Sequence, residues 1–534
     1  MSSNVIEKNK KGYIKKFLIA GLFSIICGVI TGLVIFIFKF LAKKIEHFSV
    51  NIYELSKKSV WYIILVFLGL ILLACVMYLI HKKIPESKGG GIPRSEGVLR
   101  GVLKFKSFFT LLGTFFGSMI SYLAGVPVGT EGPAVLIGTS LGDLCNKTTK
   151  ENKALGRYIN TGGAAAGFAV ATGAPLSGIL FALEEIHKKF TPMLVATVSL
   201  SVLSATFVNM SLCNLFEMNS NLFHFEILKI FEFKDLLYLI ILAVMIALVV
   251  GLYDKSIGLI FEACGHFLKK VHPLIKLIIV FVLTGILGYI YINGVYSGHD
   301  IIELLVGENG IQLSIISLFI LLIIRFIMMH LVMESSVTGG IFIPTMAIAA
   351  VIGALLGRFL MLIGMSENLY PIVVILTMCV FIGGSLRAPF TAVVLFIELT
   401  GSFTTIFYVL VVMFIVNFIV EMFDQPSFYD RVLERMEHRE HKGKERKTSH
   451  FTLKVSQNSF VCGKAVRDIM WPNSLVVLNI KNPNELEGKM DNDGERKLHV
   501  EDEVTIRCSY YDKEELFKEI KNLIGQDFEI VENQ

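Results

Sequence analysis

Long apolar runs constrain the fold of this chain more than any other feature of its sequence. The clearest are residues 17–41, 60–80, 236–253 and 274–291. A helix needs roughly 20 apolar residues to cross the hydrocarbon core of a bilayer. Because 54% of the residues are hydrophobic, against about 45–50% in soluble proteins, we predict an all-α protein that crosses the membrane many times.

The last part of the chain has a different composition. Charged residues become frequent after Arg431. Alternation predicts strands at residues 451–455, 474–480 and 503–509, and helices at residues 463–470 and 513–524. The predicted division is an N-terminal tail at 1–14, a transmembrane domain at 15–435, a charged linker at 436–449 and a small soluble α/β domain at 450–534.

Basic residues indicate how the chain is oriented in the membrane. They gather before the first run, after the second run and again at residues 431–447. Cytoplasmic loops carry an excess of Lys and Arg. We therefore predict that both termini are cytoplasmic. The eight cysteines form no C-x-x-C pair, so neither a disulfide framework nor a metal site is predicted.

Two segments of the chain resemble each other. Residues 174–184 read APLSGILFALE, and residues 388–398 read APFTAVVLFIE. Both follow a Gly-rich apolar stretch, and each is preceded by a Gly/Pro-rich interruption, at residues 129–133 and 339–344. Paired interruptions in two halves of a membrane protein indicate a binding site made by broken helices.

A third interruption, at residues 89–93, reads GGGIP. Glycines allow close approach of the backbone, and the proline suits the first turn of a new helix. Unwound backbone at membrane depth is tolerated only where it is buried in protein or lines a cavity. Helix N-termini that meet there offer N–H groups and positive dipole ends, which suit an anion.

Taken together, the three interruptions resemble the motifs of the CLC family of chloride channels and chloride/proton exchangers. Residues 89–93 are similar to G-S-G-I-P, residues 129–133 to G-R/K-E-G-P and residues 340–344 to G-I-F-x-P. The resemblance covers residues 15–435. It implies inverted repeats with broken and re-entrant helices, and a homodimer with one pore in each subunit. It also implies chloride and protons as the transported ions, with no cofactor.

Two glutamates carry the chemistry that this resemblance implies. Glu131 lies in an apolar, Gly-rich segment, where a carboxylate is a functional-site hypothesis by default. It matches the family's gating glutamate, which also carries protons. Glu185 resembles the internal proton-transfer glutamate of the exchangers, a position that is not titratable in channels. Glu184 is expected to be structural, because Glu398 is its equivalent in the second repeat.

The resemblance places the anion ligands mainly on the backbone. They are the N–H groups near Gly90 and Gly91 and those of Ile341 and Phe342. A phenolic hydroxyl completes the family's site. Tyr429 is our choice because it can donate a hydrogen bond, whereas an ungapped alignment places Phe428 there.

Two departures from the family pattern leave the transported anion open. Gly90 replaces the usual serine, which removes a hydroxyl ligand, and Thr130 replaces the basic residue that usually precedes the gating glutamate. Nitrate therefore stays an alternative to chloride. Fluoride is disfavoured, because the chain keeps Ile92-Pro93 and Pro133.

Other functions were weighed against chloride/proton exchange. A passive gated channel would keep Glu131, but Glu185 argues against it. A membrane enzyme that uses Glu184, Glu185 and His187 lacks two His residues four apart with a Glu between, so the protein is not expected to be an enzyme. A further alternative is a ligand-binding sensor whose main function resides in the C-terminal domain.

The C-terminal segment resembles the C-terminal lobe of RCK-type regulatory domains. The likeness is carried by residues 463–468 and by the strand after Glu503. It implies a dimerisation module, with a small regulatory ligand such as a cyclic dinucleotide as the alternative. The predicted location is a bacterial plasma membrane, with the lipid bilayer and a second copy as partners and no nucleic acid.

Overall fold

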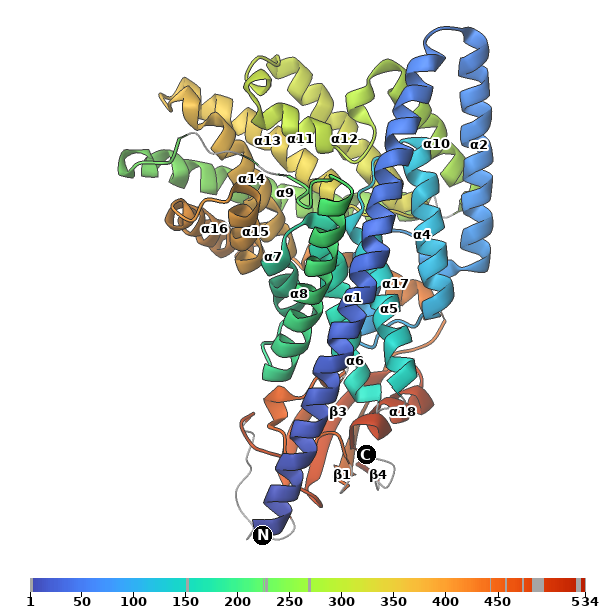
Figure 1. Ribbon diagram of the computed structural model, residues 1–534, viewed down its shortest axis with the longest axis vertical. Helices are drawn as coiled ribbons and strands as arrows, with labels where there is room; N and C mark the ends of the chain where they lie inside the picture. The colour runs from blue at the N-terminus through green and yellow to red at the C-terminus, as the bar shows by residue number, and fades with distance from the viewer. Residues whose placement is uncertain are drawn as a thin grey trace.

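The computed structural model describes residues 3–149, 153–223, 225, 229–267, 270–441, 443–456, 459–472, 475–482, 494–524 and 530–533. A large helical domain lies above a small domain that contains the sheet (Figure 1). The long first helix runs along the whole molecule, so that the N-terminus lies at the same end as the small domain. This arrangement agrees with the prediction of a membrane domain followed by a small α/β domain.

The first half of the helical domain contains the first nine helices. In chain order they are α1 (Ser3–Ser56), α2 (Val60–Lys83), α3 (Gly91–Leu99), α4 (Ser107–Ala124), α5 (Glu131–Thr149), α6 (Lys153–Thr172), α7 (Pro175–Leu180), α8 (Pro192–Leu215) and α9 (Leu236–Phe267). A π-helical turn, Phe181–Ile186, continues α7. Prolines occupy the first turns of α7 and α8, where a missing N–H costs nothing.

The second half continues with eight helices. They are α10 (Pro273–Ile290), α11 (His299–Val306), α12 (Ile315–Ser335), α13 (Phe342–Leu362), α14 (Tyr370–Leu386), α15 (Pro389–Thr400), α16 (Ile406–Glu421) and α17 (Phe428–Glu440). Among the described residues, nine helices are long and apolar enough to cross a membrane. The four runs identified in the sequence lie in α1, α2, α9 and α10, and their prediction as membrane spans is confirmed.

The two repeats run in opposite directions, and one pair of contacts demonstrates it. The Glu398 carboxylate, near the end of α15, accepts hydrogen bonds from Leu176 N and Ser177 N at the start of α7, at 2.7 and 2.9 Å. The Glu184 carboxylate accepts from Phe390 N and Thr391 N at the start of α15, at 3.0 and 2.7 Å. The N-terminus of each copy therefore lies against the C-terminal end of the other.

The small domain is a four-stranded sheet with one helix. The strands β1 (Lys447–Lys454), β2 (Leu475–Lys481), β3 (Glu503–Tyr510) and β4 (Ile530–Asn533) lie in the order β2-β3-β1-β4, and each neighbouring pair is antiparallel. The helix α18 (Lys513–Ile524) buries Leu516, Ile520 and Leu523. Its Phe517 ring packs against that of Phe451 in β1, with the centroids 5.3 Å apart.

Several predicted boundaries and elements differ from the structure. The boundary at 14/15 falls inside α1, and the charged segment 436–449 begins within α17 and ends within β1. The predicted helix at 463–470 is wrong: only the short turn Val466–Asp468 is helical. Gly463 N and Val466 N instead donate to Leu498 O and Arg496 O, so this backbone pairs in an extended manner and leaves its i→i−4 bonds unmade.

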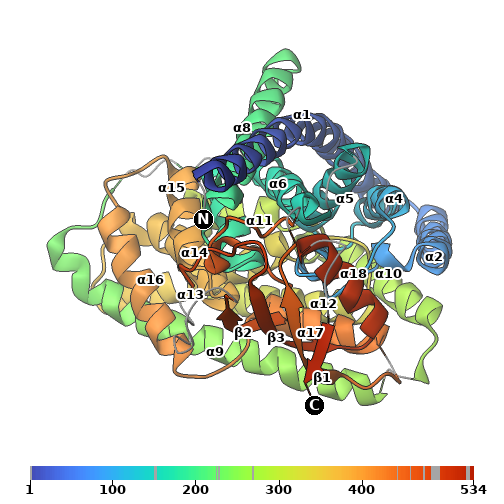
Figure 2. The same cartoon turned by 90° about the horizontal axis from the view of Figure 1, so that it is seen from below.

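The small domain contacts the N-terminal parts of α1 and α6. Arg157 and Glu519 form an ion pair at 3.2 Å, and the Tyr158 hydroxyl donates to Asp468 O at 3.3 Å. Lys16 Nζ donates to Ser459 O at 3.4 Å. Seen from below, the sheet and α18 lie under the middle of the helical domain (Figure 2).

Candidate functional site

Three helices begin at one buried place in the helical domain. They are α3 at Gly91, α5 at Glu131 and α13 at Phe342, which start at the three sequence interruptions. Backbone hydrogen bonds tie the interruptions together. Gly129 N donates to Gly340 O at 2.7 Å and Gly340 N to Gly129 O at 2.9 Å, while Gly89 N donates to Ser336 O at 3.0 Å. The first four N–H groups of a helix lack intrahelical partners, so this place concentrates free donors.

Glycine is required where the helix starts touch. A Cβ added to Gly132 would lie 2.7 Å from Gly340 Cα, and a Cβ on Gly340 would lie 2.7 Å from Gly132 N. A Cβ on Gly91 would overlap Gly132 O. Side chains at these positions would force the helix starts apart. The structure thus brings together the predicted ligand positions Gly90, Gly91, Ile341 and Phe342.

Glu131 is the first residue of α5 and is fully buried, with 0% of its surface exposed. One carboxyl oxygen accepts a hydrogen bond from the Thr130 hydroxyl at 3.1 Å. The other has no hydrogen-bond partner among the described residues. Burial of a carboxyl oxygen without a hydrogen-bond partner is costly, and a helix N-terminus favours the negative form of the group.

Glu185 lies on the π-helical turn after α7 and is also 0% exposed. Both of its carboxyl oxygens lack hydrogen-bond partners among the described residues. π-helical turns inside helices often mark functional sites. Tyr429, near the start of α17, is buried, as is its neighbour Phe428.

A cavity leads to the glycine-rich interruptions from the side of α17. Its lining includes Gly89, Gly90, Gly339 and Ile341 from the interruptions, and Arg435 and Arg439 from α17. The lining combines backbone from two of the helix starts with arginine side chains. Of these two arginines, Arg435 forms an ion pair with the Glu334 carboxylate, so its charge is balanced within the protein.

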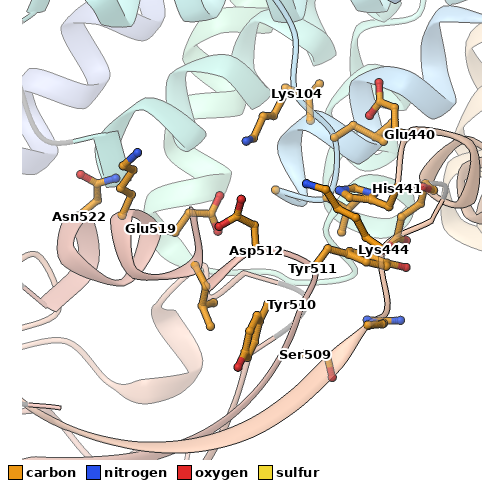
Figure 3. Close-up of a pocket in the computed structure, with 18 of the residues that line it drawn as sticks. Lys104, Glu440, His441, Lys444, Ser509, Tyr510, Tyr511, Asp512, Glu519 and Asn522 are labelled. Atoms are coloured by element: carbon orange, nitrogen blue, oxygen red, sulfur yellow. Dashed lines mark hydrogen bonds between the residues drawn. The ribbon is translucent and has the colours of Figure 1, made fainter. Parts of the chain in front are cut away.

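A second, larger cavity lies between the two domains (Figure 3). Lys104 and Glu440 enter it from the helical domain, and Asp512, Glu519 and Asn522 enter it from the small domain. On one side the rings of His441 and Tyr511 stack with centroids 4.1 Å apart. Its lining carries both signs of charge.

Two polar groups near the glutamates were not identified from the sequence. Lys39 in α1 donates to Val170 O at 2.7 Å, and its charge acts on Glu131. Arg100 contacts the segment that carries Glu185. Only the spacing of Glu96 and Arg100, four residues apart on one helix face, could have drawn attention to Arg100.

Two further charged groups form ion pairs within the helical domain. Arg387 pairs with Asp254 at 3.3 Å and donates to Gln425 O at 3.2 Å, contacts that hold α14 to neighbouring elements. Glu96 is buried and pairs with Arg100, so it does not lie on a solvated helix face. The His187 ring, one residue beyond the π-helical turn, makes a 2.7 Å hydrogen bond with the Thr161 hydroxyl.

The fold and the site define a class of protein. This is an integral membrane protein with many spans, in which two inverted repeats point the N-termini of broken helices at one buried place. The family described as "Voltage gated chloride channel" matches residues 72–421, and the chain belongs to that family.

Individual relatives agree with this assignment. The H(+)/Cl(-) exchange transporter ClcA of Salmonella arizonae is 26% identical over 428 residues, which cover 78% of this chain and 88% of that protein. A solved slow cyanobacterial Cl−/H+ antiporter superposes with a TM-score of 0.72 at 22% identity, covering 80% of this chain and 99% of that one. A CLC-type fluoride/proton antiporter gives 0.64 at 19% identity, covering 77% and 97%. The structural likenesses confirm the predicted fold class.

Proposed function

We propose that this protein is a secondary antiporter that exchanges chloride for protons across the membrane. The observation that carries the proposal is the pair of buried carboxyl groups, Glu131 and Glu185, each with an oxygen that lacks a hydrogen-bond partner among the described residues. A static carboxylate at such depth would be expected to have a partner. A carboxyl group that gains and loses protons during transport needs an oxygen that is not held in a fixed hydrogen bond.

In the proposed mechanism Glu131 is both the gate and the outer proton site. As a carboxylate it competes with chloride for the donors at the starts of α3, α5 and α13. When it is protonated, its affinity for this positive region falls, and chloride takes its place. Glu185 is the inner proton site, which receives protons from the cytoplasmic side and passes them towards Glu131.

Chloride is held in this mechanism mainly by backbone N–H groups near Gly90, Gly91, Ile341 and Phe342. The Tyr429 hydroxyl is the proposed side-chain donor, because a phenol can donate a hydrogen bond and the Phe428 ring cannot. The cavity beside Gly90, which has Arg439 in its lining, supports anion entry from the cytoplasmic side. Chloride is preferred over nitrate and fluoride as the transported anion. Named exchangers among the relatives support this choice, although Gly90 offers no hydroxyl.

The remaining proposals concern assembly and location. We propose a homodimer in a bacterial plasma membrane with both termini cytoplasmic. The basic segments of the sequence support this orientation, as does the common position of the N-terminus and the small domain. The small domain is proposed to be a dimerisation module of RCK type. The cavity between the domains supports the alternative of a small regulatory ligand.

A liposome assay tests the exchange directly. Purified protein is reconstituted with a chloride gradient, and proton and chloride movements are recorded together. We expect the chloride gradient to drive protons uphill, and expect Glu131→Ala and Glu185→Ala each to abolish the proton movement. Chloride flux without proton movement in the unmutated protein would favour a passive gated channel. Absence of any anion flux would overturn the proposed function.

A further inference from the structure

Arg100, the residue that follows α3, makes a dense set of contacts with the end of the π-helical turn. Its Nε donates to Ile186 O at 2.9 Å and its Nη2 donates to Glu185 O at 3.0 Å. The same guanidinium pairs with Glu96 and donates through Nη1 to Asp430 Oδ1 at 2.6 Å. The side chain is only 9% exposed.

The carbonyl groups of Glu185 and Ile186 need a hydrogen-bond donor from outside the helix. The last carbonyls of a helical segment have no intrahelical donor. After the π-helical turn, the described backbone bonds go to earlier residues, from His187 N to Ala182 O and from Lys189 N to Leu183 O. The planar guanidinium offers several N–H groups in a fixed geometry, so it binds two neighbouring carbonyls and a carboxylate at once, which a lysine ammonium cannot reproduce.

The Glu185 side chain depends on this backbone anchor. Neither of its carboxyl oxygens has a hydrogen-bond partner among the described residues, so the carboxyl group is held by the main chain that carries it and by the packing around the buried side chain. The charges that act on it come from Glu96, Lys188, Asp430 and Arg100.

Arg100 is itself paired with two acidic side chains, Glu96 and Asp430. One of them, Asp430, stays ionised: burial opposes its charge, but hydrogen bonds from Lys188 and Arg100 lower its pKa to about 2. Because Asp430 and Glu96 both pair with Arg100, the arginine anchors the Glu185 backbone without forming an ion pair with its carboxyl group. Glu185 therefore stays free to exchange protons.

We propose that Arg100 is a positioning residue for proton transfer, which fixes the end of the π-helical turn and thereby the place of the Glu185 carboxyl group. This inference rests on the proposed role of Glu185 in exchange. A displacement of about 1 Å of a reacting group lowers rates by up to about 100-fold. Loss of the anchor should therefore reduce proton movement more than chloride movement.

The test uses the full-length protein in liposomes and measures the number of protons moved per chloride together with the chloride turnover. Arg100→Lys keeps the charge and removes the planar fork, while Arg100→Gln removes both. The matched control is Arg94→Lys, the same change at a buried arginine inside the adjoining helix α3, which pairs with Glu440 at 3.1 Å. Elution as a single species in gel filtration shows that each variant is folded.

We expect both Arg100 variants to lower the ratio of protons to chloride at least about three-fold, with chloride turnover within about two-fold of the unmutated protein. Arg94→Lys should leave the ratio unchanged. An unchanged ratio in Arg100→Lys would overturn the positioning role, and the less disruptive lysine variant keeps the test valid if Arg100→Gln does not fold. Lack of proton movement in the unmutated protein would instead refute the proposed exchange.

Discussion

At the residue scale, Lys464 is an unusual cation, because it is buried where the small domain contacts the helical domain. It is 5% exposed. Its Nζ lies 3.1 Å from the centre of the Phe460 ring and 3.8 Å from the Met193 sulfur. Burial first, and then the charge of Lys16, lower the pKa of Lys464 to about 6.

This lowered pKa predicts that stability rises with pH. The unfolded lysine holds its proton up to about pH 10.4, whereas the folded one releases it above about pH 6. Between these values the unfolded state binds more protons, so the free energy of unfolding increases by about 1.4 kcal/mol per pH unit from this group. The thermal midpoint in detergent should rise between pH 6 and pH 9, and Lys464→Met should remove most of that rise.

The control for this prediction is Lys513→Met. Lys513 also lies over aromatic rings of the small domain, 5.6 Å from Phe517, but it is solvent-exposed. Its replacement should leave the slope with pH as in the unmutated protein. Equal slopes for Lys464→Met and the unmutated protein would show that Lys464 is charged in the folded state.

Single residues differed in how far the sequence could identify them. Glu131 and Glu185 were recognisable because a carboxyl group in an apolar segment is conspicuous from the sequence alone. Arg100 and Lys464 were not, because their surroundings come from segments that are far away in the chain. For Tyr429, the sequence left two adjacent positions open, and both Phe428 and Tyr429 are buried at the start of α17.

At the element scale, the two repeats hold each other through reciprocal carboxylates. Glu184 and Glu398 each accept two backbone N–H groups and one hydroxyl, of Thr391 and Ser177 respectively. The carboxylates also interact favourably with the helix dipoles. The sequence prediction that Glu184 is structural agrees with this geometry, and the reason is that it caps the start of α15.

Removal of one of these charges should destabilise the helical domain. Hydrogen bonds to a charged group contribute about 1.5–3 kcal/mol, against about 1 kcal/mol for neutral pairs. We therefore expect Glu398→Gln and Glu184→Gln each to cost about 2 kcal/mol and to lower the thermal midpoint by a few degrees. Ser177→Ala, which removes one hydroxyl and keeps the carboxylate, should cost about half as much. A midpoint unchanged in both glutamine variants would mean that the carboxylates contribute no stability.

The elements themselves were predictable where one physical signal dominated. The length and apolarity of the hydrophobic runs indicated the membrane spans. The Gly and Pro residues indicated the interruptions before α3, α5 and α13. The π-helical turn had no signal, because its sequence is that of an ordinary apolar helix. The segment 463–470 was misread because its backbone bonds go to residues 494–498, and local propensity says nothing about such pairing.

At the scale of the whole molecule, the small domain is attached by a short connection and by specific contacts. Only residues 441–446 separate α17 from β1, whereas the charge pattern predicted a longer solvated tether. The Arg157–Glu519 ion pair lies beside Gly101, where an added Cβ would be 3.0 Å from the Arg157 guanidinium and 3.1 Å from the Glu519 carboxylate. The small domain therefore contacts the chain directly after Arg100.

Reversal of this ion pair tests whether the contact holds the domains together. Glu519→Lys places a second cation against Arg157, and the lost attraction plus the new repulsion amount to about 1 kcal/mol for such partly exposed groups. A difference of about 1.4 kcal/mol is tenfold in population. Trypsin should therefore cut after Lys464, which is buried at the contact between the domains, about five times faster in this variant.

The double variant Arg157→Glu with Glu519→Lys separates the ion pair from other effects. It restores opposite charges in swapped positions, so cleavage should return to within about two-fold of the unmutated rate. Arg157→Glu alone should behave like Glu519→Lys, because it places two carboxylates together. If both single variants were cut at the unmutated rate, the domains would be held by the apolar contacts around Lys464, and the ion pair would contribute nothing to docking.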